Sequence, residues 1–114
     1  MTKYKVVLVP FPFDDLSGNK VRPAVCLTNP VGPYKHLILA FITSRVQPNG
    51  LDTDLILDVH DAEFSATGLR LSSTLQLHRL MTATTTFIQR ELGVLSIAMQ
   101  SQVNERLHML FNLE

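Results

Sequence analysis

The sequence has little of what several classes of protein need. Its single cysteine, Cys26, excludes an internal disulfide framework and every cysteine-rich zinc site, and its strand-like setting predicts a buried, structural side chain. It has no tryptophan and few other aromatic residues, so it lacks the side chains that line a proline-recognition groove in a peptide-binding adaptor. The longest apolar runs, over residues 6–9 and 37–42, are far shorter than the ~20 residues of a membrane span. We therefore expect no membrane partner.

The sequence also lacks a net charge, because 10 Lys and Arg side chains balance 10 Asp and Glu side chains. Residues 1–50 carry six positive and two negative side chains, whereas residues 51–114 carry four positive and eight negative ones. This split excludes a uniformly basic protein and predicts a dipolar surface with one basic face. The N-terminal residues lack the longer apolar region and the cleavage site of a secretory signal, which predicts a cytoplasmic protein.

The remaining composition is that of an ordered globular protein. Hydrophobic residues make up 46% of the chain, and no low-complexity tract or internal repeat is visible. A chain of 114 residues buries roughly two-thirds of its unfolded surface, which is enough for one modest core. We expect residues 1–114 to form a single domain.

Five segments have the composition of short strands, and turn-forming residues separate them. They cover residues 6–11, 24–28, 37–43, 54–60 and 72–80. In the fourth segment Leu55, Leu57 and Val59 fall on one face and polar residues dominate the other, which is typical of a half-buried strand.

The hydrophobic period changes near the C-terminus. Residues 84–92 are predicted to form a short helix that Gly93 ends, and Ser96 is predicted to cap a longer amphipathic helix reaching about Phe111. Together with the five strands, this pattern predicts the α+β class. We expect a small, strongly curved antiparallel sheet or partly closed barrel, with one or two C-terminal helices at one side.

Two groups of polar residues are candidates for binding a phosphate. Lys20 and Arg22 end a polar loop before the second strand, where a guanidinium can grip a phosphate in a fork. Thr43, Ser44 and Arg45 stand at the end of the third strand. If these strands are neighbours, the two groups meet in a phosphate-sized pocket of donors. The alternatives are an arginine paired with an aspartate of its own loop, and hydroxyls that only cap a turn.

An acidic stretch offers a rival interpretation. It contains oxygen and nitrogen donors enough for a divalent ion, which would indicate a metal-dependent hydrolase. These residues are Asp52, Asp54, Asp58, His60 and Asp61. Their alternation is also what a solvated strand face shows, and we expect that structural role, with no metal and no cofactor.

Five ordered motifs carry a specific resemblance. They are Val-Leu-Val-Pro-Phe-Pro-Phe at residues 7–13, Lys20-x-Arg22-Pro23-Ala24, Ile42-Thr43-Ser44, Gly68-Leu69 followed by Ser73, and Gly93-x-Leu95-Ser96. Over nearly the whole chain, their order and spacing resemble the MazF/PemK-like toxin family. The resemblance implies an SH3-like barrel with appended helices, a homodimer, and a sequence-selective endoribonuclease that cuts single-stranded RNA without a metal ion. It also implies an antitoxin protein that silences the enzyme by binding across the dimer.

The resemblance further implies roles for individual residues. Arg22 and Thr43 match the family's functional arginine and threonine. Arg22 would stabilise charge in the transition state and is a candidate proton donor, while Thr43 and Ser44 would hold the phosphate. Aromatic and arginine side chains are the usual partners of unstacked bases. The residues expected to contact the RNA substrate are Lys20, Arg45, Gln76 and Phe13.

The chain departs from the family pattern at two places. It has Tyr4-Lys5 where many members have Gly-Asp, and it has Gln76 and His78 where some members carry an arginine and an aspartate as acid and base. A glutamine cannot transfer a proton, whereas an imidazole suits a general base at neutral pH, so we predict that His78 is the base. The alternatives are a strand histidine without a role, and a catalytically silent relative that binds RNA or a partner protein.

Overall fold

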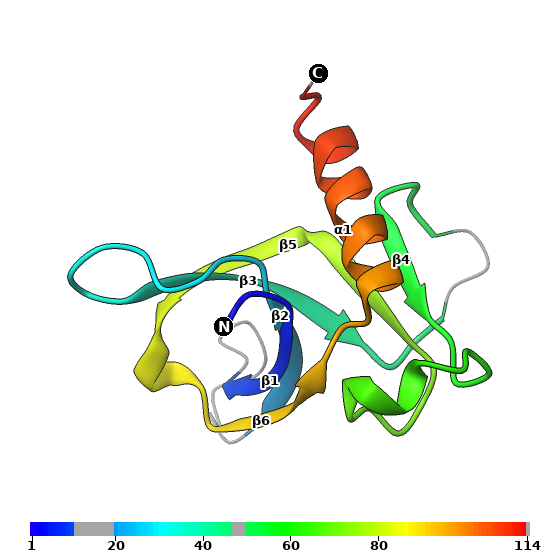
Figure 1. Ribbon diagram of the computed structural model, residues 1–114, viewed down its shortest axis with the longest axis horizontal. Helices are drawn as coiled ribbons and strands as arrows, with labels where there is room; N and C mark the ends of the chain where they lie inside the picture. The colour runs from blue at the N-terminus through cyan, green and yellow to red at the C-terminus, as the bar shows by residue number, and fades with distance from the viewer. Residues whose placement is uncertain (11–19, 47–49, 114) are drawn as a thin grey trace.

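The computed structural model describes residues 1–10, 20–46 and 50–113, and these form a curled six-stranded sheet with one helix. The sheet is antiparallel, and its strands lie in the order β4-β5-β3-β2-β1-β6. The strands are β1 (Lys5–Pro10), β2 (Val21–Cys26), β3 (His36–Thr43), β4 (Asp54–Leu57), β5 (Ser73–Thr84) and β6 (Arg90–Val94). Helix α1 (Ile97–Leu110) stands at one side of this half-barrel (Figure 1). The predicted α+β class is confirmed.

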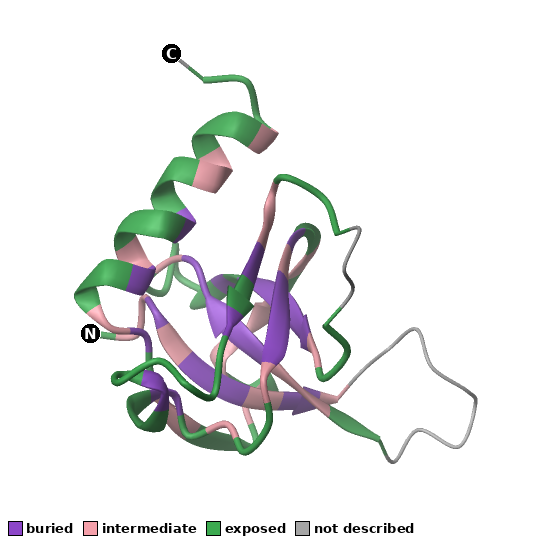
Figure 2. Ribbon diagram, turned by 90° about the vertical axis from the view of Figure 1, so that its right-hand side faces the viewer, coloured by how far each residue is buried: buried purple, intermediate pink, exposed green. Residues whose placement is uncertain are grey.

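Each face of the sheet has its own hydrophobic core, because successive side chains of a strand point to opposite faces. On one face Ile42 and Leu75 pack with Met99 of helix α1. On the other face Ala24 and Phe41 belong to a second buried cluster. Figure 2 shows the consequence, since buried positions follow the strands and only one side of the helix is buried.

Strand β2 begins earlier than predicted, at Val21 instead of Ala24. Pro23 therefore lies inside a strand, although proline cannot donate a ladder hydrogen bond. The strand tolerates it because Pro23 is paired with Leu8 of β1, whereas pairing with β3 starts only at Ala24. At Pro23 the strand is paired with β1 but not yet with β3, so the missing N–H group leaves no gap in the β2–β3 ladder.

The predicted short helix over residues 84–92 is wrong. Strand β5 continues to Thr84, a 3-10 turn, η2 (Thr85–Phe87), follows, and the next residues form β6 against β1. Threonine is β-branched and favours extended backbone, so this segment continues a strand more readily than it starts a helix. Gly93 does not end a helix; it sits inside β6 and pairs with Val6. The molecule thus has one C-terminal α-helix among its described residues.

The other strand boundaries differ by a few residues. Strand β4 ends at Leu57 instead of residue 60, because Asp58 begins a turn in which its carbonyl accepts from the Asp61 N–H at 2.9 Å. Within the described residues β1 ends at Pro10, and the predicted strand residue Phe11 lies outside them.

Helix α1 begins as predicted. The Ser96 hydroxyl accepts a hydrogen bond from the Met99 N–H at 3.1 Å, which satisfies a free donor of the first turn. The helix ends at Leu110, one residue before the predicted end at Phe111, and the Phe111 side chain is exposed. Arg106 Nε donates to the Asp54 carbonyl at 2.9 Å and so ties the helix to the start of β4. No helix in the described ranges is long and apolar enough to cross a membrane.

Candidate functional site

Two hollows lie where β3 ends and β5 begins. The first has a volume of about 180 Å³ and the second about 190 Å³. The first is lined by Thr43, Arg45, Gly50, Leu51, Asp54, Ile56, Thr74 and Gln76. The second is lined by Val21, Arg22, Pro23, Ile42, Ser44, Leu69, Arg70, Leu71 and Ser73.

Strand alternation places the two hollows on opposite faces of the same sheet. Thr43 pairs with Thr74 across β3 and β5, and Asp54 pairs with Gln76 across β4 and β5. Directly paired residues share a face, so these four side chains build the first hollow. Ser44, one residue along from Thr43, belongs to the second.

The structure therefore brings together some predicted site residues and separates others. Thr43, Arg45 and Gln76 share the first hollow, whereas Arg22 and Ser44 line the second. The expectation that Thr43 and Ser44 share one pocket does not hold, because consecutive strand residues face opposite ways.

Arg22 stands at the boundary between the hollows. It lines the second one, but the pairing of Ala24 with Phe41, continued by two residues along each strand, places Arg22 across from Thr43 on the other face. A long guanidinium side chain at this position can serve either face. The donors that were predicted to hold a phosphate thus lie at one end of the sheet.

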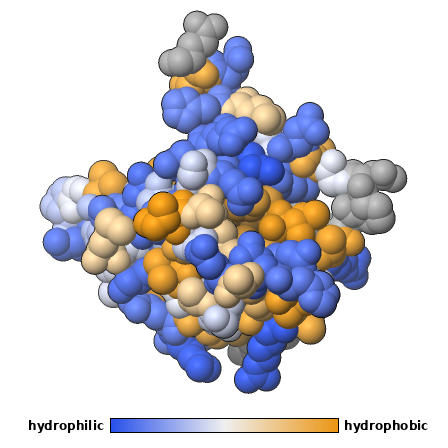
Figure 3. All heavy atoms as spheres, turned by 45° about the vertical axis from the view of Figure 1, so that its right-hand side comes forward, coloured by the Kyte–Doolittle hydropathy of each residue, from blue (hydrophilic) through white to orange (hydrophobic). Residues whose placement is uncertain are grey.

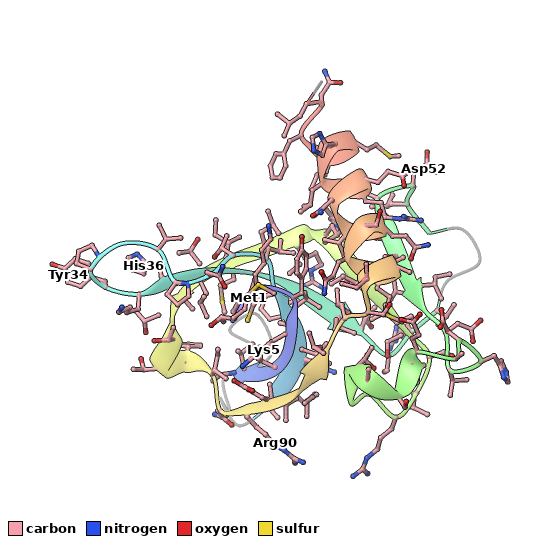
Figure 4. All side chains as sticks on the ribbon, in the orientation of Figure 1. Met1, Lys5, Tyr34, His36, Asp52 and Arg90 are labelled. Carbon is pink, nitrogen blue, oxygen red and sulfur yellow. The ribbon has the colours of Figure 1, made fainter. Side chains whose placement is uncertain are left out.

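The remaining predicted contacts lie at different distances from this end. Lys20 is exposed and directly precedes β2. Phe13 lies outside the described residues. Tyr34, an exposed aromatic residue that could also stack on a base, lies at the tip of the β2–β3 hairpin with its ring 6.1 Å from that of His36 (Figure 4). The hairpin tip and the two hollows are at opposite ends of β3.

The acidic stretch does not gather into a metal site. In residues 1–10, 20–46 and 50–113, no group of three or more His, Cys, Asp and Glu side chains is placed to hold an ion. Asp58, His60 and Asp61 are exposed along the turn after β4, and Asp58 uses its carboxylate to accept from the His60 N–H at 2.9 Å.

His78 lies on a bulge of β5. Phe41 pairs with Gln76, but the preceding β3 residue, Ala40, pairs with Leu80, so the pairing register shifts across residues 77–79. Bulges bend a strand and redirect side chains, and they are common beside active sites. Here His78 Nδ1 lies 3.9 Å from Oδ1 of Asp54, with 37% of the histidine side chain exposed.

Sequence reasoning considered Asp54 only as a possible metal ligand and missed its place in the first hollow. The alternation of the fourth strand segment predicted a solvated face for it, yet only 11% of its side chain is exposed. That face is covered because it forms the first hollow, against Gln76 of the neighbouring β5. The burial of Asp54 results from the pairing of β4 with β5, and the residues next to Asp54 in the sequence do not indicate it.

Apolar side chains form part of the rim of both hollows. Four of the exposed large hydrophobic residues of the molecule line them: Val21 and Leu71 at the second, Leu51 and Ile56 at the first. Figure 3 shows one face of the molecule, on which hydrophobic patches lie among hydrophilic side chains. Hydroxyl, amide and guanidinium donors beside apolar surface suit a ligand with both phosphates and unstacked bases.

A comparison with models of protein families finds one family over almost the entire chain. The model described as "PemK-like, MazF-like toxin of type II toxin-antitoxin system" matches residues 2–111. Among curated proteins no sequence gives a significant match.

Solved structures with the same fold include three toxin structures. The toxin MazF-mt6 of Mycobacterium tuberculosis is 21% identical, with a TM-score of 0.74 over 96% of this chain and 98% of that one. An endoribonuclease in complex with its cognate antitoxin, from a mycobacterial species, is 14% identical, with a TM-score of 0.72 over 100% and 97%. A MazE-MazF structure from Deinococcus radiodurans is 17% identical, with a TM-score of 0.70 over 100% and 97%. At these identities the likeness concerns the fold.

Proposed function

Because the chain belongs to the family of PemK-like, MazF-like toxins of type II toxin-antitoxin systems, we propose that it is a sequence-selective endoribonuclease acting on single-stranded messenger RNA. The observation that carries the proposal is the donor-rich end of the sheet, where Thr43, Gln76 and Arg45 line one hollow and Arg22 stands beside it. One of the similar structures is itself titled an endoribonuclease.

The proposed reaction needs no metal ion. The 2′-hydroxyl of the RNA loses its proton to a base, its oxygen bonds to the adjacent phosphorus, and the bond from phosphorus to the 5′-oxygen breaks. A cyclic phosphate and a protonated 5′-hydroxyl result. Arg22 stabilises the charge that grows on the phosphorane and is the candidate donor of the second proton. Thr43 holds this phosphate in the first hollow, whereas Ser44 lines the second hollow on the other face and does not contact the same phosphate.

His78 is the proposed base. Its side chain is partly exposed, it projects from the bulge of β5, and it is two residues from Gln76, which lines the first hollow. An imidazole can accept a proton at neutral pH, which the amide of Gln76 cannot do. Gln76 is instead a hydrogen-bonding contact for the RNA.

The partners follow from the same family. We propose that the chain forms a homodimer and is silenced by a cognate antitoxin protein; the mycobacterial endoribonuclease of similar fold is in complex with its own cognate antitoxin. The exposed apolar residues at the rims of the hollows, Val21, Leu51, Ile56 and Leu71, provide surface for such contacts. We place the activity in the cytoplasm, where messenger RNA is translated.

Incubation of the pure protein with a long single-stranded RNA, followed by mapping of the product ends, tests the proposal. We expect cyclic or 3′-phosphate ends, 5′-hydroxyl ends, and unchanged cutting in excess EDTA. In Arg22→Ala the rate should fall on the order of 10² to 10³-fold, because a transition-state donor is lost. Lys35→Asn is the matched control, since it removes a positive charge at the hairpin tip and Asn tolerates the left-handed backbone of Lys35, whose φ is 56°.

The second candidate function is RNA or protein binding without catalysis. It is favoured by Gln76, which replaces a proton-transferring residue of some family members. Tight binding without cutting, over many RNA sequences, would support it and refute the first proposal. Cutting that EDTA abolishes would instead indicate the metal-dependent class.

A further inference from the structure

We propose that Asp54 is a positioning residue for His78, and that its carboxylate keeps the imidazole in the tautomer that can act as a base. This inference rests on the proposed function for its catalytic meaning, but the contact itself does not. It adds to the site a residue on β4 that lies outside the sequence motifs.

Hydrogen bonds to Leu51 and Arg106 fix the backbone and one carboxylate oxygen of Asp54. Its N–H donates to the Leu51 carbonyl at 3.0 Å, and its Oδ2 accepts from the Leu51 N–H at 3.1 Å. Its carbonyl accepts from Arg106 of helix α1 at 2.9 Å. These contacts fix where the second carboxylate oxygen, Oδ1, must lie.

Oδ1 of Asp54 is buried and, within the described part of the chain, accepts no hydrogen bond. A buried carboxylate oxygen without a donor is costly, so such an atom in a folded protein calls for an explanation. The nitrogen Nδ1 of His78 lies 3.9 Å away, which is within ion-pair distance and beyond hydrogen-bond length. Catalytic contacts are often long in the free enzyme and shorten when substrate binds.

His78 reaches the carboxylate from a diagonal position across β4 and β5. Gln76 is the residue of β5 paired with Asp54, so residue 78 lies two places beyond that pair on the same face of the strand. Side chains at such diagonal positions can contact each other when one of them is long or aromatic. The shift of the β3–β5 register between Gln76 and Leu80 lies beside this contact.

The chemistry of a carboxylate–imidazole pair explains its value to the reaction. A carboxylate accepts from Nδ1–H, so the neutral ring carries its proton on Nδ1 and its lone pair on Nε2. The proton of the RNA 2′-hydroxyl moves to Nε2, and the nearby carboxylate then stabilises the imidazolium that forms. Asp54 itself takes up no proton.

Asp54→Asn is the informative variant because the Leu51 N–H fixes how the new amide must lie. That donor needs an acceptor, so the amide oxygen stays at the Oδ2 position and the NH₂ group replaces Oδ1. The amide then donates to Nδ1 and moves the ring proton to Nε2. Histidine ¹⁵N chemical shifts distinguish the two tautomers, and His78→Ala identifies the signals. We expect Nδ1–H in the wild type and Nε2–H in Asp54→Asn.

The kinetic test is a double-mutant cycle. Asp54→Asn should lower kcat roughly 10 to 100-fold with little change in KM, and should have no further effect when His78 is already alanine. Asp52→Asn, an exposed aspartate of the same turn, should cut RNA at the wild-type rate. Thermal unfolding shows whether Asp54→Asn remains folded at the assay temperature.

Two results would overturn the inference. One is an unchanged His78 tautomer in Asp54→Asn, and the other is an equal loss of rate in both backgrounds, as a purely structural residue would give. If the wild type cuts no RNA, the proposed function fails, while the ¹⁵N measurement still decides whether Asp54 sets the tautomer.

Discussion

Cys26 is a buried cysteine whose surroundings make its thiol unreactive. It lies in β2 with no exposed surface, in the cluster that also contains Ala24 and Phe41. Burial, with a smaller contribution from the nearby charge of Glu91, raises the pKa of the thiol from 9.0 to about 11. The predicted buried strand position is confirmed, and the raised pKa explains why such a thiol is inert.

We expect Cys26 to react very slowly with a thiolate-selective disulfide reagent at pH 8. A pKa higher by about two units lowers the thiolate fraction about a hundredfold, before steric protection is counted. The reaction should be complete within the mixing time in denaturant. Absorbance of the released thiol measures both rates, and equal rates with and without denaturant would contradict the buried position.

The same pKa has a consequence for stability. The folded protein binds the thiol proton more tightly than the unfolded chain, so this contribution is fully present below pH 9 and is lost as the pH rises towards about 11. Loss of folding at high pH would thus have one identifiable source in the core.

At the level of single residues, the sequence predicted which residue types belong to the site better than it predicted where their side chains lie. It singled out Thr43, Ser44 and Gln76 by type and position, but their division between two hollows depends on strand pairing. Asp54 was predicted to be solvated, because its local alternation could not show that β5 would cover it. His78 was predicted as a base, but its contact with Asp54 depends on the pairing of β4 with β5 and could not be predicted.

At the scale of elements, the backbones of β6 and of the 3-10 turn η1 (Phe64–Thr67) lie unusually close to each other. A Cβ atom on Gly93 would lie 2.1 Å from the Ala66 carbonyl oxygen, and a Cβ atom on Gly68 would lie 2.1 Å from the Leu92 carbonyl oxygen. These are backbone atoms that cannot swing away. Two glycines therefore allow two main chains to touch.

Gly93→Ala should lower the free energy of unfolding by about 3 kcal/mol, because the added methyl group must force η1 away from β6. Denaturant titration of the purified variant measures the loss. Gly32→Asn is the matched control: Gly32 has a φ of 74° and open space around it, and Asn adopts left-handed backbone readily. The control should stay within about 0.5 kcal/mol, and a similar loss in both variants would contradict a steric origin.

Most elements were predictable from the sequence, and β6 shows why one was not. Five strand segments and the helix after Ser96 were identified from alternation, β-branched residues and caps. A short segment around residues 84–94 has apolar spacing that fits a helix turn or a strand, and its true partner, β1, lies about eighty positions earlier. Gly93 looked like the end of a helix when its role is close approach to η1.

For the whole molecule, the charge split takes a definite spatial form. Lys20 precedes β2 and Arg45 follows β3, and because these strands are antiparallel both residues stand at the end of the sheet that holds the hollows. The predicted separation of basic and acidic surface is incomplete there, since Asp54 shares the first hollow with Arg45. The positive side chains at this end include Lys20, Arg22, Arg45 and the exposed Arg70 of the second hollow.

Binding of RNA should therefore depend only moderately on salt. With about four phosphate contacts, from Lys20, Arg22, Arg45 and Arg70, the plot of log K against log salt should have a slope of roughly −3. Fluorescence anisotropy with a 2′-deoxy-substituted, uncleavable strand measures it. Arg45→Ala should flatten the slope by about 0.7 and Lys35→Asn should leave it unchanged. A slope steeper than about −5 would show that a much larger surface contacts the backbone.

The period-two division of the sheet end has a consequence for how such a site can change over time. One thickness of backbone separates the hollow that contains Thr43 from the hollow that contains Ser44. Substitutions in β3 alter one hollow at a time, and each can be tuned without the other. A deletion of one residue before Thr43 would exchange the two faces and move buried side chains such as Phe41 and Ile42 into the wrong cores. Sequence changes in β3 must therefore preserve the register of the strand, and this matters more than the identity of any one residue.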